Sequence, residues 1–283
     1  MDDGQALPSF GREEERTHHL RAQVAHVTDI GRRRRNNQDN LLVLPIRADG
    51  AAQEVEPGLI DIEKGRLLVA VADGMGGHFG GEEASRLCVE NLAKEIVSQL
   101  SSGQAALPAA LLKAVEAAHK AVFAHAQNYR EKLTMGTTLT AALLHGEGVE
   151  LAQVGDSRAY LFREGNLILL TQDQTIGNQL RSRGEDTNKV DAQIQEMLTQ
   201  AAGAQEAIDV AMTAVELEPR DLLLLCCDGL HKVVAPAEIA DTLETDMTIQ
   251  EKAAELVRLA NEGGGPDNIT VILTEITEAD NTA

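Results

Sequence analysis

The amino-acid sequence predicts an α+β fold built on antiparallel sheets. Predicted strands occur in blocks and predicted helices in pairs, instead of alternating one for one along the chain. Turns that contain glycine, at Gly146, Gly148 and Gly165, join neighbouring strands directly. No internal repeat is present, and the apolar segments of the 283-residue chain form one continuous core. We therefore interpret residues 21–276 as a single domain.

The first half of the chain begins with strands and continues with helices. The run at residues 67–72 is nearly all apolar, which is typical of a strand buried on both faces. Residues 47–64 before it are polar, contain Gly and Pro, and predict an exposed loop insertion. Two more strands precede this insertion, and two amphipathic helices with apolar side chains at helical spacing follow. In order, these elements are strands at residues 22–28 and 40–46 and helices at residues 82–100 and 108–129.

The second half returns to strands, and the first three of them predict an antiparallel meander at residues 137–144, 149–154 and 158–163. Residues 171–207 are mostly polar with weak helical spacing and predict a mobile surface segment. Pro236 in a first turn, and Thr248 with Glu251 as a capping box, mark two helix starts. The remaining elements are strands at residues 207–217 and 221–227, helices at 236–243 and 249–259, and a strand at 269–273.

Net charge, apolar runs and cysteine count limit which partners and which cellular compartment are compatible with the sequence. The formal net charge of −20 repels a phosphate backbone, which argues against nucleic acid and favours cations. No run approaches the roughly 18 apolar residues of a membrane span. The odd count of three cysteines, two of them adjacent, is no disulfide framework, so we expect a cytoplasmic protein. Residues 1–20 lack a secretion signal and predict a flexible extension, and residues 277–283 a C-terminal tail.

Aspartates stand where apolar strands begin or end. Asp73, Asp228 and Asp267 each adjoin such a strand beside a glycine or asparagine, and Asp156 lies between two strands. A single Asp-Gly pair is most often a tight turn. Several carboxylates at the ends of buried strands are costly to desolvate, however, unless they share a cation. The set therefore predicts a metal site.

Carboxylate oxygens without cysteine or a histidine pattern select hard ions, so we expect Mg²⁺ or Mn²⁺. Two such ions, about 3.5 to 4 Å apart, bridge a water, lower its pKa and align it for in-line attack on phosphorus. Hydrolysis of a phosphate ester is the natural use of such a pair.

The ordered motifs GRRRRNNQDN, VADGMGGH, MGTTL, VGDSRAY, LLLLCCDGL and GGGPDNITV resemble the metal-dependent protein phosphatases, the type 2C serine/threonine family, in a bacterial-type member. The resemblance covers residues 22–275. It implies a central β-sandwich flanked by helices on both faces, with a dinuclear metal site at one end. It also implies hydrolysis of phosphoserine and phosphothreonine, and it makes residues 174–206 a flap.

The resemblance assigns roles to single residues. The Asp73 carboxylate would bridge two Mn²⁺ or Mg²⁺ ions, the Gly74 carbonyl would bind the first, and Asp228 and Asp267 would hold the second. Asp39 would join the cluster through metal-bound water.

Two further roles follow from the same resemblance. Asp156 would bind a third, weaker ion or only tune the site. Arg34 would grip the substrate phosphate, since its forked guanidinium matches phosphate geometry better than lysine. Thr137 and Thr138 would support the site and Asn268 would orient neighbouring loops. Arg32, Arg33 and Arg35 have no matching role.

The chain departs from the family pattern at Gln38, Met75 and Gln174, and along the flap at residues 179–203. Gln38 replaces a glutamate, and the loss of its charge is expected to weaken metal binding. Met75 stands where some relatives carry a histidine that protonates the leaving oxygen. His78 is an alternative proton donor, although a turn or helix-start role is the commoner one. Gln174 replaces a histidine next to the flap.

Three hypotheses follow. The first is an active, monomeric phosphoprotein phosphatase that opposes a Ser/Thr kinase or acts on a phosphorylated regulator in a partner-switching pathway. The second is a family member without turnover that binds a phosphoprotein as a regulator. The third treats DGMGGHFGG as a nucleotide-phosphate loop, but this segment lacks the lysine and the spacing of a P-loop.

Overall fold

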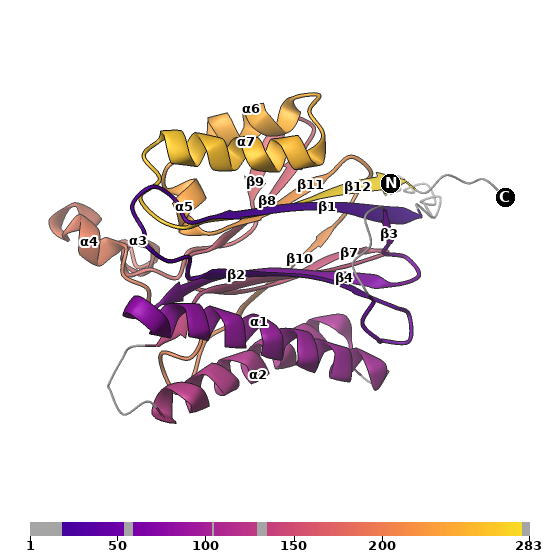
Figure 1. Cartoon of the computed structure of the whole chain (residues 1–283), viewed down its shortest axis with the longest axis horizontal. Coiled ribbons are helices and arrows are strands. Elements are labelled where there is room, and N and C mark those ends of the chain that lie inside the picture. Colours follow the sequence, from indigo (N-terminus) through magenta and orange to yellow (C-terminus); the bar gives the residue numbers. More distant parts are fainter. Residues whose placement is uncertain (1–18, 54–58, 104, 129–134, 279–283) are drawn as a thin grey trace, which may run out of the picture.

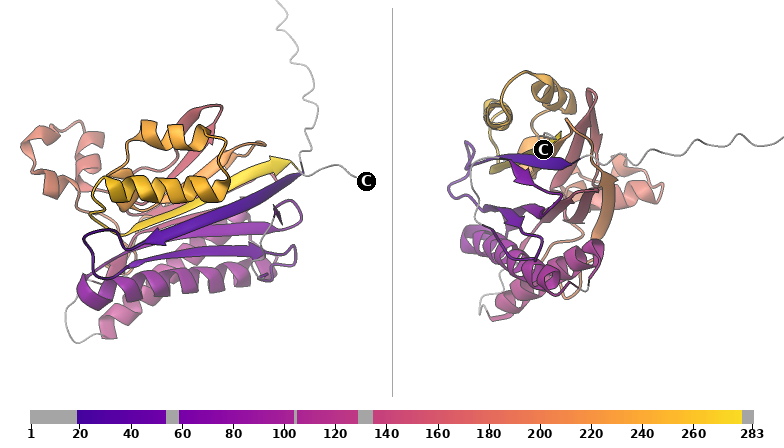
Figure 2. Two further views of the ribbon diagram at one scale, coloured as in Figure 1. Left: turned by 45° about the horizontal axis from the view of Figure 1, so that its top comes forward. Right: turned by 90° about the vertical axis from the view of Figure 1, so that its right-hand side faces the viewer.

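The computed structural model describes residues 19–53, 59–103, 105–128 and 135–278, apart from the side chains of residues 77–79. Two antiparallel six-stranded sheets stack face to face, and a pair of long helices covers each outer face (Figures 1 and 2). This arrangement confirms the predicted fold class and the helix-flanked sandwich. Most of residues 1–20 and 279–283 of the predicted tails lie outside the described residues.

The first sheet, here called the β12 sheet, has the strand order β3-β1-β12-β11-β8-β9. The second, the β4 sheet, has the order β10-β7-β6-β4-β2, with β5 added beside β4. The strands of the β12 sheet are β1 (Leu20–Asp29), β3 (Ile60–Asp61), β8 (Arg158–Arg163), β9 (Asn166–Leu169), β11 (Leu222–Cys226) and β12 (Ile269–Glu278). Those of the β4 sheet are β2 (Asp39–Ile46), β4 (Arg66–Met75), β5 (Gly136–Thr137), β6 (Leu139–His145), β7 (Gly148–Val154) and β10 (Ala211–Glu216).

Three apolar layers hold the sandwich together, one between the sheets and one under each helix pair. Strand β4 contributes to two layers, because successive side chains point to opposite faces. Leu67, Val69 and Val71 pack between the sheets, whereas Leu68 and Ala70 face the helices. The predicted burial of this strand on both faces is therefore confirmed. Cys226 and Cys227 likewise lie in different layers, as their adjacency predicts.

The helices follow their apolar periodicity. Helices α1 (Gly77–Ser101) and α2 (Leu107–Asn128) cover the β4 sheet, and α6 (Pro236–Glu244) and α7 (Ile249–Glu262) cover the β12 sheet (Figure 1). The predicted capping box is present at α7: the Thr248 hydroxyl accepts from the Glu251 N–H at 3.3 Å, and the Glu251 carboxylate accepts from the Thr248 N–H at 2.8 Å.

The predicted meander of three strands is wrong at its third strand. Strands β6 and β7 pair with each other, but β8 pairs with β9 and β11 in the other sheet. The chain crosses between the sheets through Gly155, Asp156 and Ser157, and Gly155 adopts a φ of 103° there, a conformation that favours glycine. This crossing places Asp156 at the end of the sandwich, between the two sheets.

Several elements differ from the expected boundaries. Strand β9 and helix α5 (Asp228–His231) were not expected, because both are too short to show periodicity. Strand β12 continues to Glu278, five residues beyond the expected end at Leu273. The insertion at residues 47–64 is not wholly exposed, since β3 pairs with β1 and the Ile62 side chain is fully buried between the sheets. The expected flap contains α3 (Ile176–Ser182), the 3₁₀ turn Thr187–Lys189 and α4 (Ala192–Gln195).

Candidate metal centre

Aspartates from five separate segments meet at one end of the sandwich. An open cavity of about 320 Å³ is lined by Asp73, Asp156, Asp228 and Asp267, together with Arg34 and Gly74. Asp39 lies beside this cavity, because it is the register partner of Asp73 where β2 pairs with β4. The structure therefore brings Arg34, Gly74 and the five aspartates together at this end of the sandwich.

The backbone of Asp73 in β4 is held by the side chains of two consecutive threonines. The Asp73 N–H donates to Thr138 Oγ1 at 3.0 Å, and Thr137 Oγ1 donates to the Asp73 carbonyl at 2.9 Å. The next residue must be glycine, because a Cβ at Gly74 would lie 2.1 Å from the Gly81 carbonyl oxygen. The supporting role predicted for the two threonines agrees with these contacts.

The loop that carries Arg34 is held against the turn before β12 by one side chain. Asn268 Nδ2 donates to the carbonyls of Ile30 and Asn36, at 3.0 Å each, and Asn268 Oδ1 accepts from the Gln38 N–H at 2.8 Å. Asn268 thus orients this loop, as expected. The Arg34 guanidinium forms an ion pair with Asp267. About half of the Arg34 side chain is exposed to solvent, and the residue lines the cavity.

The clustered charges change the protonation of the carboxylates. Burial raises the pKa of Asp39 to about 6, although a hydrogen bond from Thr270 opposes the change. Burial, followed by the neighbouring charges of Asp39 and Asp228, raises the pKa of Asp73 well above its usual value. Burial also raises the pKa of Asp156 to about 6. Without a cation, the cluster therefore resists full ionisation.

Asp228 behaves differently because a cation lies beside it. Burial acts to raise the pKa of Asp228, but the ammonium of Lys232 lowers it below the usual value. Lys232 Nζ donates to Asp228 Oδ2 at 2.8 Å and lies 3.3 Å from Asp156 Oδ2. This lysine was not expected in the site. Its only signal in the sequence is the spacing of four residues from Asp228, which places Lys232 directly after α5, one helical turn from Asp228.

Two carboxylates each leave one buried oxygen without a hydrogen-bond partner among the described residues, Asp39 Oδ1 and Asp228 Oδ1. Their second oxygens are satisfied, since Asp39 Oδ2 accepts from Thr270 Oγ1 at 2.7 Å and Asp228 Oδ2 accepts from Lys232. Buried polar atoms are rarely left unpaired unless an ion or water completes them. The donor set therefore fits hard divalent cations.

Two further residues near the site were missed. Within the described part of the chain, Asp39, Asp73 and Cys227 form the one group of three His, Cys, Asp or Glu residues whose ligand atoms lie within 4.8 Å of one another. Burial raises the pKa of the Cys227 thiol well above its usual value, so the thiol stays protonated. Thr270, on a strand far away in the sequence, donates a hydrogen bond to Asp39, and no local sequence pattern predicts this contact.

The departures from the family pattern occupy defined places. Gln38 and Met75 line the cavity. Gln174, which replaces the histidine, accepts a hydrogen bond from the Gly155 N–H through Oε1 at 2.7 Å. It therefore still anchors the loop that crosses between the sheets. The side chain of His78 lies outside the described residues. Its role as a proton donor, like the third ion at Asp156, stays a prediction.

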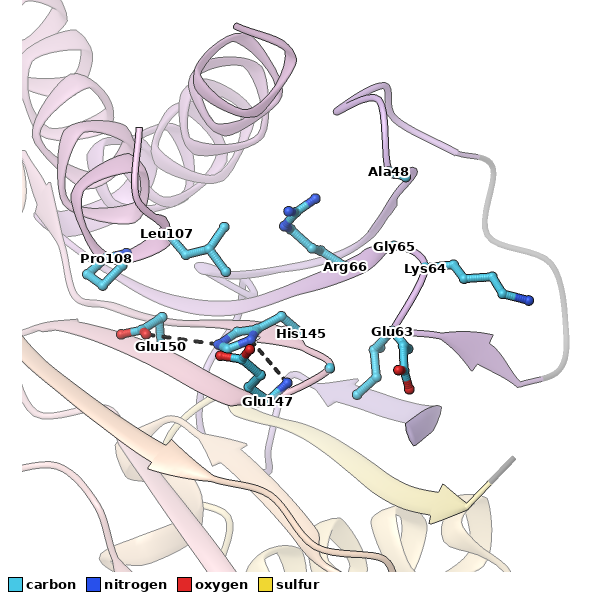
Figure 3. Close-up of a pocket in the computed structure, with 12 residues that line it drawn as sticks. Ala48, Glu63, Lys64, Gly65, Arg66, Leu107, Pro108, His145, Glu147 and Glu150 are labelled. Atoms are coloured by element: carbon cyan, nitrogen blue, oxygen red, sulfur yellow. Dashed lines mark hydrogen bonds and ion pairs between the residues drawn. The ribbon is translucent and has the colours of Figure 1, made fainter. Parts of the chain in front are cut away.

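A larger cavity, of about 760 Å³, lies at the opposite ends of β2 and β4 (Figure 3). Its lining mixes both charge signs, including Arg66, His145 and Glu150, and the His145 ring lies 3.9 Å from the Glu150 carboxylate. The close group of ligand atoms described above is absent from this lining. The acidic end of the sandwich is therefore the candidate metal centre.

A two-sheet sandwich with an acidic end that fits divalent cations and a facing arginine is typical of the class of metal-dependent phosphatases. The family described as protein phosphatase 2C matches residues 58–273. The serine/threonine phosphatase stp of Listeria welshimeri is 34% identical over 254 residues, which are 88% of this chain and 93% of that protein.

Solved structures agree. A serine/threonine phosphatase from S. agalactiae superposes with a TM-score of 0.75 at 30% identity, covering 90% of this chain and 99% of that one. The catalytic domain of the phosphatase PstP, in complex with 2 manganese ions, superposes with a TM-score of 0.72 at 33% identity, covering 92% and 100%. The chain belongs to the protein phosphatase 2C family and is a metal-dependent serine/threonine protein phosphatase. Among the described residues, no helix is long and apolar enough to cross a membrane.

Proposed function

We propose that the acidic end of the sandwich is the catalytic site and that it holds two Mn²⁺ or Mg²⁺ ions. Asp73 and the Gly74 carbonyl would bind the first ion, and Asp73, Asp228 and Asp267 the second, with Asp39 completing the cluster through water. The observation that carries this proposal is the pair of buried oxygens on Asp39 and Asp228 that find no hydrogen-bond partner in the described part of the chain. When bound, the ions supply an activated water and neutralise the incoming phosphate.

Arg34 is proposed to bind the substrate phosphate. Its guanidinium is partly exposed, lines the same cavity as the aspartates and is oriented by Asp267. The hydrogen bond to Asp267, together with the charge of that carboxylate, holds the pKa of Arg34 above its usual value, so the group is always positive. A planar, charged fork at the cavity wall suits two phosphate oxygens better than a point charge.

The cavity is open, which suits a phosphorylated side chain presented by another protein. We therefore propose phosphoproteins as substrates and, as the opposing partner, a Ser/Thr kinase that phosphorylates the same residues. The three cysteines are buried and unpaired, which supports work in a reducing compartment such as the cytoplasm. A single chain supplies every residue named above, so the proposed site functions in a monomer.

Paired substitutions in one loop test the role of Arg34. Arg34→Ala removes the proposed phosphate contact, and a charged hydrogen bond of about 1.5 to 3 kcal/mol corresponds to a loss of roughly 10- to 100-fold in kcat/KM. Arg33→Ala, in the same exposed loop, is the matched control and should leave kcat/KM nearly unchanged. Equal losses in the two variants would show that Arg34 acts only through the general charge of the loop.

A further inference from the structure

The described part of the metal centre contains a cation of its own. Lys232 Nζ lies 2.8 Å from Asp228 Oδ2, 3.3 Å from Asp156 Oδ2 and 3.9 Å from Glu196 Oε2. These carboxylates come from α5, from the loop between β7 and β8, and from the segment after α4. The single ammonium therefore reduces the repulsion among three carboxylates that come from three separate segments.

Local geometry directs the lysine to this place. Lys232 follows Asp228 by one helical turn, and its backbone N–H donates to the Asp228 carbonyl at 3.0 Å. The neighbouring His231 holds the other partner, because its Nε2 lies 3.0 Å from the Asp156 carbonyl oxygen. A carbonyl only accepts, so Nε2 carries the proton in this contact. Two consecutive side chains thus fix both the backbone and the carboxylate of Asp156.

The lysine leaves the proposed two-ion site free. It contacts Oδ2 of Asp228, whereas the buried Oδ1, which has no hydrogen-bond partner within the described ranges, remains available as a ligand. Lys232 also contacts one carboxylate oxygen of Asp156, Oδ2 at 3.3 Å, and only about 5% of Asp156 is exposed. An additional ion between Asp156 and Asp228 would have to displace the ammonium.

We infer that the Lys232 ammonium takes the position between Asp156 and Asp228 that a third divalent ion would otherwise occupy, so that this phosphatase binds two ions and excludes a third. The inference rests on the proposed function, because it takes Asp228 as a ligand of the two-ion site. Lys232 is a positioning residue: it holds Asp228 and Asp156 and replaces an exchangeable ion by a tethered charge.

The number of bound ions tests this inference. Titration of the full chain with Mn²⁺, followed by electron paramagnetic resonance of the free ion, should give two ions per wild-type chain and three per chain for Lys232→Met. Lys232→Arg retains the charge and should return the count to two. Lys64→Met, at an exposed lysine far from the centre, is the matched control and should also bind two.

The outcomes separate the inference from the site assignment. Three ions in the wild-type chain, or two in a folded Lys232→Met, would overturn the inference and leave the two-ion site intact. No ion in the wild-type chain would overturn both. The wild-type count decides the matter even if Lys232→Met does not fold. As a second readout, the Mn²⁺ dependence of turnover should follow one saturable phase in the wild type and gain a second, weaker phase in Lys232→Met.

Discussion

Thr270→Val is a sharp test of how the fold prepares the metal centre. Thr270 Oγ1 donates to the buried Asp39 Oδ2 at 2.7 Å, and the change removes this donor while keeping the shape of the side chain. A hydrogen bond to a charged group is worth about 1.5 to 3 kcal/mol, and loss of a group that orients a metal site typically weakens binding about 10- to 100-fold. We expect the Kd for Mn²⁺ at pH 7 to rise by that factor.

The same strand offers a control. Thr274 is fully buried on β12, and its hydroxyl has no hydrogen-bond partner among the described residues. Thr274→Val should leave both Mn²⁺ affinity and Tm unchanged, or raise Tm slightly, because it removes an unsatisfied polar group. Calorimetric titration of the two variants makes the comparison. Equal affinities in Thr270→Val and the wild type would refute the idea that Thr270 prepares Asp39 for the ions.

Two further predictions concern protonation and packing. Because burial raises the pKa of Asp39 to about 6, lowering the pH from 7 to 5 adds a proton that cations must displace, and calorimetry should show Mn²⁺ binding at least about tenfold weaker; a pH-independent affinity would contradict this. Gly74→Ala places a Cβ 2.1 Å from the Gly81 carbonyl oxygen and should cost about 1 to 3 kcal/mol in chemical denaturation. Gly80→Ala, whose Cβ would meet nothing closer than 3.9 Å, should cost nothing; equal stabilities in the two variants would show that β4 tolerates the clash.

Features that depend on a local sequence pattern could be predicted. Asp73 and Asp228 were found because an apolar run stops at each, and a buried strand that ends in a carboxylate needs a partner for it. The two faces of β4 followed from its uninterrupted apolar run. The helix pairs followed from their periodicity and, at α7, from the capping box.

What the sequence did not reveal depends on contacts between distant segments. The short connection between β7 and β8 is compatible with a hairpin, and only the packing of the two sheets decides that it crosses between them. The contacts of Lys232 with Asp156 and of Thr270 with Asp39 join segments far apart in the chain. Helix α5 is a single turn, which is too short to give a periodic pattern in the sequence. The contact between Lys232 and Asp228 across this turn was therefore not predicted.

The most direct test of the account is hydrolysis of a phosphothreonine peptide with and without Mn²⁺ by the wild type and by Asp73→Asn. Asp73 lines the cavity and is proposed to bind both ions. Its replacement should therefore remove turnover, while an unchanged Tm shows that the fold persists. We predict turnover that requires Mn²⁺ in the wild type and none above background in Asp73→Asn. Undiminished turnover in a folded Asp73→Asn would contradict the assignment of the acidic end as the catalytic site.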